Sequence, residues 1–171
     1  DLHDDMGSTL SSIRFFSEYV RTRLNGKHPE VEPVLSRISS SASALSESMQ
    51  DIIWTINTRH DRFEDLVARM QSFGSRVLEA RGIDFKVRIA NDFRSARLNI
   101  GQRRNLYLIF KEAINNAVKY SECRQIELLL TISRQHLLMT IKDDGTGFDT
   151  ENTSGNGLYN IRQRAGEIGG T

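Results

Sequence analysis

Apolar residues recur at intervals of three and four along the first 58 residues of the chain, which is the period of an amphipathic helix. One apolar stripe covers residues 2–24, and a second covers residues 32–58. Between them, Gly26 suits a helix end and Pro29 prevents continuation, so the sequence predicts a helical hairpin. Two helices with one stripe each cannot enclose a core. We therefore expect two hairpins to pool their stripes in a homodimeric four-helix bundle.

The pattern changes after the polar residues 57–62, and we interpret this stretch as the junction between a domain of residues 1–60 and a domain of residues 61–171. The predicted elements beyond it are helices at 63–82, at 101–120 and after Gly157, and strands at 83–89, 126–132 and 137–141. This mixture predicts an α/β domain, and the whole chain is assigned to the α+β class.

Composition narrows the possible partners. Lys and Arg (23) nearly balance Asp and Glu (22), so the net charge of +1 provides no general attraction to nucleic acid or to an anionic membrane. The single cysteine, Cys123, leaves no internal disulfide, which fits a reducing cytoplasm. No apolar run approaches the roughly 18 residues that span a bilayer. We therefore expect this piece to be soluble and cytoplasmic, and because the chain opens inside a helix motif we expect it to be a fragment. A missing upstream region could anchor its parent protein in the inner membrane.

The helix predicted at residues 101–120 carries the first candidate site. Glu112, Asn116 and Lys119 share one face, and spacings of four and three stack their side chains on adjacent turns. Magnesium takes a few oxygen ligands and keeps its waters, so this face fits a magnesium and phosphate site. Taken alone, such a face is more often ordinary solvated surface. Asn115-Asn116 in mid-helix, however, carries a propensity cost without an evident folding benefit.

Two glycine-containing segments follow. Residues 143–147 come directly after a predicted strand and are rich in Asp and Gly, which is often only a turn. Alternatively, Asp143 accepts a hydrogen bond from an adenine amino group, while Gly145 and Gly147 let the backbone approach the base. Residues 155–158 introduce the last helix, whose exposed N–H groups and dipole favour phosphate. An isolated Gly-x-Gly is at least as often a plain helix entry.

His3 is the candidate nucleophile. It lies at the edge of the first apolar stripe, so its ring would sit beside the bundle core and remain accessible. Asp4 could accept a hydrogen bond from one ring nitrogen, which makes the other nitrogen the better nucleophile. Considered alone, a helix histidine is more often an exposed or capping residue.

Together these motifs resemble the two-component sensor histidine kinases, in the subfamily whose phosphoacceptor box reads His-Asp-x-x-Gly, here residues 3–7. The second half resembles the GHKL or Bergerat ATP-binding fold of gyrase, Hsp90 and MutL. Its N box matches residues 112–120, its G1 box residues 143–147 and its G2 box residues 155–158. The resemblance covers nearly the whole chain, and four short boxes in this order make it specific.

The resemblance implies a dimerisation and histidine phosphotransfer hairpin followed by a catalytic ATP-binding domain with an α/β sandwich fold. His3 would be the phosphoacceptor, Asp4 its activator, and Glu112 an aid to magnesium or proton handling. The residues implied to hold ATP and Mg²⁺ are Asn116 and Glu112 at the metal, Lys119 and Tyr120 at the phosphates, Asp143, Gly145 and Gly147 at the adenine, and Gly155, Gly157 and Leu158 at the lid. The phosphoryl group would then pass from His3 to an aspartate of a response regulator receiver domain.

The chain departs from the family in two places. Ser8 stands where the subfamily commonly has Gln, which orients water for hydrolysis of the regulator's phosphoaspartate, so we predict weak phosphatase activity. The family also adds a closing strand that we expect to be missing beyond Thr171.

Two other functions stay open from the sequence. One is a non-catalytic dimeric scaffold whose nucleotide domain is a conformational binding module, and the intact set of Glu112, Asn116 and Asp143 argues against such a degenerate pocket. The other is a Bergerat-fold ATPase of the gyrase or Hsp90 type, for which no histidine hairpin is expected upstream.

Overall fold

The computed structural model describes residues 2–56, 62–90, 97–133, 136–147 and 157–171. The chain divides into two compact units, Asp1–Ile56 and Asn57–Thr171. Most of the predicted junction, residues 57–61, lies outside the described residues. No helix in the described part of the chain has both the length and the apolar character needed to cross a bilayer.

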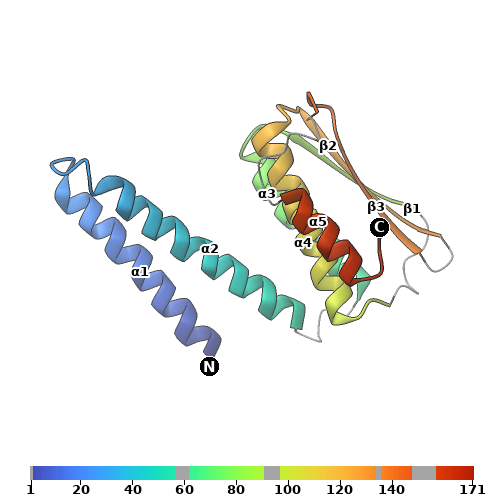
Figure 1. The fold of residues 1–171 in the computed structure, drawn as a ribbon, viewed down its shortest axis with the longest axis horizontal. Coiled ribbons are helices and arrows are strands. Elements are labelled where there is room, and N and C mark those ends of the chain that lie inside the picture. Colours follow the sequence, from blue (N-terminus) through green and yellow to red (C-terminus); the bar gives the residue numbers. More distant parts are fainter. Residues whose placement is uncertain (1, 57–61, 91–96, 134–135, 148–156) are drawn as a thin grey trace. The chain divides into compact units, whose positions relative to one another are not determined.

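The first unit is a hairpin of two long helices, α1 (Leu2–Leu24) and α2 (Glu32–Ile56) (Figure 1). Gly26 occupies the left-handed region with φ 73°, and the N–H of Lys27 donates to the Leu24 carbonyl at 2.9 Å, so the chain turns where Gly26 was predicted to end the helix. Leu10 and Ala42 are buried in this unit. The predicted helices and the turn between them are confirmed.

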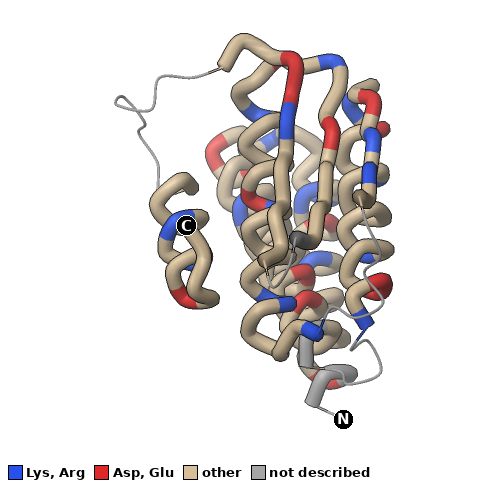
Figure 2. The backbone as a smooth tube through the Cα atoms, turned by 90° about the vertical axis from the view of Figure 1, so that its right-hand side faces the viewer, with Lys and Arg blue, Asp and Glu red and all other residues tan. Residues whose placement is uncertain are grey.

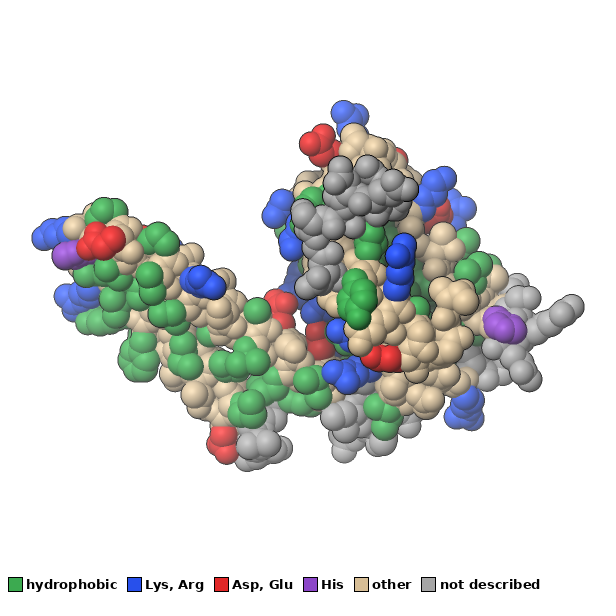
Figure 3. Space-filling view, viewed as in Figure 1, with side chains coloured by type: hydrophobic (Ala, Val, Ile, Leu, Met, Phe, Trp, Pro, Cys, Tyr) green, Lys and Arg blue, Asp and Glu red, His purple; other side chains and the backbone are tan. Residues whose placement is uncertain are grey.

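The hairpin leaves most of its apolar stripe accessible when it is considered alone. The apolar and aromatic residues that remain exposed are Met6, Ile13, Phe15, Phe16, Tyr19, Val20, Val34, Ile38, Leu45 and Ile52. The space-filling view shows apolar side chains spread along this unit (Figure 3). The four-helix bundle needs a second chain, so it stays a prediction.

The second unit is a sheet with helices on one side (Figure 1). Its elements are α3 (Phe63–Glu79), β1 (Asp84–Ala90), α4 (Ile100–Tyr120), β2 (Gln125–Ser133), β3 (His136–Asp143) and α5 (Gly157–Glu167). The sheet order is β1-β2-β3, with β1 parallel to β2 and β2 antiparallel to β3. The predicted α+β class is confirmed, and the elements differ from their predicted ranges by only a few residues at their ends.

The core of this unit lies between the sheet and the helices α3 and α4. Its fully buried apolar residues include Leu66, Met70, Leu78, Phe110, Ile114, Ile126, Leu128 and Leu130. The ring of Phe110 packs between those of Phe73 and Phe85, at centroid distances of 6.1 and 6.3 Å. Complete burial of one such side chain contributes about 1.5–3 kcal/mol. These contacts fix α4, the helix of the candidate site, against the sheet.

The opposite face of the sheet carries charged side chains. Along β1, exposed Lys86 and Arg88 alternate with partly buried Phe85 and Val87. Arg88 pairs with Glu127 on β2 at 2.5 Å, and Figure 2 shows Lys, Arg, Asp and Glu residues along the strands. Arg88 is exposed and Glu127 is partly buried, and ion pairs at a protein surface contribute about 1 kcal/mol or less. The exposed charged residues along β1 indicate an ordinary solvated face.

Candidate functional site

Helix α4 begins at a complete capping box. The Oδ1 atom of Asn99 accepts the N–H of Gln102 at 2.8 Å, and Oε1 of Gln102 accepts the N–H of Asn99 at 3.0 Å. These two bonds satisfy N–H groups that the first turn of a helix leaves without partners. Because the start of α4 and its buried face are both fixed, Glu112 and Asn116 are held on consecutive turns, and both are partly buried.

The start of α5 lies directly against this face of α4. A Cβ atom added at Gly157 would lie 2.6 Å from Oε1 of Glu112 and 3.1 Å from Nδ2 of Asn116. Only glycine permits this approach without displacing the Glu112 carboxylate. The structure therefore brings together two motifs that are 45 residues apart, counting from Glu112 to Gly157.

The loop after β3 meets the other end of α4. The N–H of Thr146 donates to the carbonyl oxygen of Ser121 at 2.9 Å, and a Cβ added at Gly145 would lie 2.0 Å from that oxygen. Oδ1 of Asp143 accepts the N–H of Gly145 at 3.0 Å. Gly147 has φ 70°, a left-handed conformation that favours glycine. Both glycines of this segment are thus required, one by close approach and one by backbone conformation.

Asp144 has a structural connection that the sequence analysis did not anticipate. Its Oδ1 atom accepts the N–H groups of Gln125 and Arg124, at 2.9 and 2.8 Å. The bond from Gln125, followed by that from Arg124, lowers the pKa of Asp144 below its ordinary value, because both bonds stabilise the ionised carboxylate. The second Asp of an Asp-Asp pair after a strand was the only signal that could have indicated this role.

The remaining predicted residues are distributed over both units. Lys119 and Tyr120 are exposed at the end of α4, and Leu158 is partly buried in the first turn of α5. Gly155 lies outside the described residues. His3 and Asp4 belong to α1 in the first unit, and their side chains lie outside the described part of the structure.

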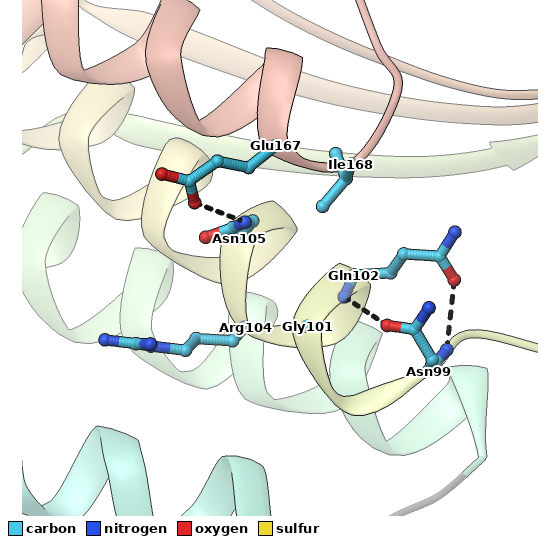
Figure 4. Close-up of a pocket in the computed structure, with 7 residues that line it drawn as sticks. All are labelled: Asn99, Gly101, Gln102, Arg104, Asn105, Glu167 and Ile168. Carbon is cyan, nitrogen blue, oxygen red and sulfur yellow. Dashed lines mark hydrogen bonds between the residues drawn. The ribbon is translucent and has the colours of Figure 1, made fainter.

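A depression of about 370 Å³ lies away from these motifs, between the first turns of α4 and the end of α5 (Figure 4). Nδ2 of Asn105 donates to Oε2 of Glu167 at 3.0 Å across it. None of the described residues of α5 is fully buried. The bond between Asn105 and Glu167 therefore anchors the C-terminal end of α5 to α4. At the N-terminal end of α5, Gly157 lies against Glu112 and Asn116 of α4.

The arrangement fits a nucleotide with a hard metal ion. Glu112 and Asn116 offer carboxylate and amide oxygens of the kind that magnesium prefers, and the glycine contact at α5 keeps both beside a helix N-terminus that favours phosphate. Lys119 adds a positive charge on the same helix. Asp143 retains a second carboxylate oxygen, Oδ2, that can accept an amino group.

Comparisons with known proteins give a consistent assignment. Residues 101–171 match the family described as histidine kinase-, DNA gyrase B-, and HSP90-like ATPase. The chain is 26% identical over 179 residues to sensor histidine kinase ComP of Bacillus subtilis, covering 99% of this chain and 23% of the relative. It is 27% identical over 173 residues to signal transduction histidine-protein kinase/phosphatase UhpB of Salmonella typhimurium, covering 100% of this chain and 34% of the relative. The chain thus spans about a quarter to a third of the length of these relatives.

A solved structure shares the fold. The histidine kinase domain from the Erythrobacter litoralis EL346 blue-light activated histidine kinase matches with a TM-score of 0.56 and 18% identity, covering 99% of this chain and 85% of that chain. At this identity the likeness shows the fold alone.

Proposed function

We propose that the chain is part of a two-component sensor histidine kinase with a GHKL-type ATPase domain, and that it transfers the γ-phosphoryl group of ATP to His3. The observation that carries the proposal is the contact of Gly157 with Glu112 and Asn116. It joins the predicted metal-binding helix to the predicted phosphate-binding helix start.

Each motif residue then has a defined task. Asp143 accepts a hydrogen bond from the adenine amino group and so selects the base, while Lys119 and Tyr120 lie against the phosphates. Asn116 and Glu112 would hold Mg²⁺, which neutralises charge on the phosphate oxygens when bound. Positioning and charge neutralisation are the main sources of catalysis in phosphoryl transfer.

The hairpin presents one imidazole nitrogen of His3 to the γ-phosphoryl group. Asp4 fixes the tautomer of His3, so that the nitrogen without a proton faces the phosphoryl group. A nitrogen–phosphorus bond forms at His3 as the bond between the γ-phosphorus and its bridging oxygen breaks, and ADP leaves with that oxygen. The phosphoryl group then passes to an aspartate of a response regulator receiver domain.

We also propose a homodimer held by the hairpin. An apolar groove of about 430 Å³ lies between α1 and α2, and its lining includes Leu10, Ile13, Val34, Ile38 and Leu45. Four of these five residues are exposed in the single chain, and a second hairpin would cover them.

The function is tested by incubation with ATP labelled at the γ-phosphate. We expect an acid-labile, alkali-stable adduct on the protein, and we expect His3→Gln to reduce it to background. His28→Gln is the matched control, because His28 is an exposed residue that pairs with Glu30 at 3.1 Å in the hairpin turn, and it should retain full labelling. Full labelling of His3→Gln would exclude this acceptor. Release of phosphate without a protein adduct would favour the ATPase alternative. ATP binding without phosphate release and without an adduct would favour the scaffold.

A further inference from the structure

The carboxylate of Asp144 joins two segments that are distant in sequence. Asp144 follows β3, and its Oδ1 atom accepts the N–H groups of Arg124 and Gln125 at 2.8 and 2.9 Å, where β2 begins. A further bond runs from the Asp144 N–H to the Gln125 carbonyl oxygen at 3.3 Å. Asp144 therefore ties its own loop to the first residue of β2 through both its side chain and its backbone.

The end of α4 holds the next part of the same loop. The carbonyl oxygen of Ser121 accepts the N–H of Thr146 at 2.9 Å and contacts Gly145 closely. Ser121 is only 7% exposed, and its hydroxyl donates to the Ala117 carbonyl oxygen at 2.7 Å. The acceptor for the loop is thus itself fixed to the last turn of α4.

We propose that Asp144 is a positioning residue for the nucleotide, whose carboxylate holds residues 143–147 between β2 and the end of α4 so that Asp143 faces the adenine. The proposal rests on the proposed function, because Asp144 has this role only if Asp143 reads the base. Asp144 itself does not touch the ligand.

The geometry explains why an acidic side chain with one methylene group stands here. Its oxygen must reach two neighbouring N–H groups that point out of the start of β2, and an ionised oxygen accepts both more strongly than a neutral one. The backbone bonds lower its pKa below its ordinary value, so it keeps its charge in more acidic solution than an ordinary aspartate does. Asn offers the same oxygen without the charge, whereas Ala offers no acceptor.

The attachment also links the two protein regions that are proposed to contact the nucleotide. Lys119 and Tyr120, predicted at the phosphates, directly precede Ser121, and Asp143, predicted at the adenine, directly precedes Asp144. If the attachment at Asp144 is lost, the distance between Asp143 and the end of α4, which carries Lys119 and Tyr120, is no longer fixed. The loss should then fall on nucleotide affinity rather than on the chemical step.

The test measures ATP binding by calorimetric titration and initial rates of autophosphorylation, both on the 171-residue chain. We expect Asp144→Ala to weaken ATP binding by about tenfold or more, with KM rising in parallel and kcat changing by less than about twofold. Asp144→Asn should restore binding to within about threefold of wild type. Glu127→Ala is the matched control, because it removes a carboxylate from β2 that pairs with Arg88 on the solvated face, and it should bind as wild type does.

Equal ATP affinity in Asp144→Ala and wild type, with a wild-type circular dichroism spectrum, would overturn the inference alone. If Asp144→Ala does not fold, the inference is tested by comparing the ATP affinity of Asp144→Asn with that of Asp144→Ser. Ser is too short to reach both N–H groups, so equal affinity of these two variants also overturns the inference, and weaker binding by Ser supports it. Absence of ATP binding by wild type would overturn the proposed function together with the inference, so the two failures are distinguished by the wild-type titration.

Discussion

Two glycines of the candidate site are required by neighbours of different kinds. At Gly145 the neighbour is the Ser121 carbonyl oxygen, a backbone atom that cannot move without shifting the end of α4. At Gly157 the nearest atom is the tip of the Glu112 side chain, which can rotate away. A side chain at Gly145 would therefore destabilise the fold, whereas a side chain at Gly157 would displace the carboxylate of Glu112, the proposed metal ligand.

Gly157→Ala should thus separate activity from stability. We expect the unfolding temperature to stay close to that of wild type, because Glu112 can rotate, and the rate of autophosphorylation to fall by about 10- to 100-fold, because the displaced carboxylate no longer serves the metal. Thermal unfolding and initial-rate measurements check this. Gly166→Ala is the control, since it makes the same change in α5 at a position where an added Cβ would contact no described atom within 4 Å. Equal rates in the two variants would show that the Gly157 contact has no catalytic role.

At the scale of single residues, the sequence predicted which residues belong to the candidate site but not all of the contacts that hold them. The spacing of Glu112 and Asn116 was enough to place them on one helix face, because a helix has a fixed period. The role of Asp144 was not predictable, because its partners at Arg124 and Gln125 lie about 20 residues earlier and depend on how β2 and β3 pair. A local pattern contains no information on such a contact.

At the scale of elements, the hairpin provides the clearest test of assembly. Leu45 lines the groove between α1 and α2 and is 53% exposed in the single chain. We expect Leu45→Glu to place a charge in the dimer interface and to weaken dimerisation by more than about 100-fold, which light scattering after gel filtration would show as a monomer. Ala44→Glu is the control, because Ala44 is exposed but does not line the groove. A dimer that survives Leu45→Glu would place the interface elsewhere.

The helices and strands were predictable because apolar spacing reports which face of each element is buried. The order β1-β2-β3 and the parallel pairing of β1 with β2 were not predicted. Alternation along a strand fixes its buried face, but many partners satisfy the same alternation. Packing of α3 and α4 on one side of the sheet, around Phe110, selects among them.

At the scale of the whole molecule, the proposed phosphoacceptor and the proposed nucleotide motifs belong to different compact units. The order of the four boxes along the chain was enough to predict that these motifs lie in separate units. Under the proposed function, the nucleotide must be delivered from its own unit to His3, and two hairpins must pair in a dimer. No residue pattern within one unit specifies either of them.

Under the proposed function, the phosphorylation state of the regulator depends on the rates of both phosphorylation and dephosphorylation, and we expect Ser8 to affect the rate of dephosphorylation. The hydroxyl of Ser8 donates to the Asp5 carbonyl oxygen at 2.8 Å, so its single proton is used within α1. Wild type should therefore dephosphorylate the regulator slowly. Ser8→Gln, whose longer amide can orient a water molecule, should raise the rate by about tenfold or more.

The measurement is phosphate release from a phosphorylated receiver domain in the absence of ATP. Ser12→Gln is the matched control, because Ser12 lies one turn further along α1 and makes the same kind of bond, to the Ser8 carbonyl oxygen at 2.9 Å. If the amide acts through its position relative to His3, only the variant at residue 8 gains activity. Rapid dephosphorylation by wild type, or an equal gain in both variants, would mean that the side chain at position 8 does not set the phosphatase rate.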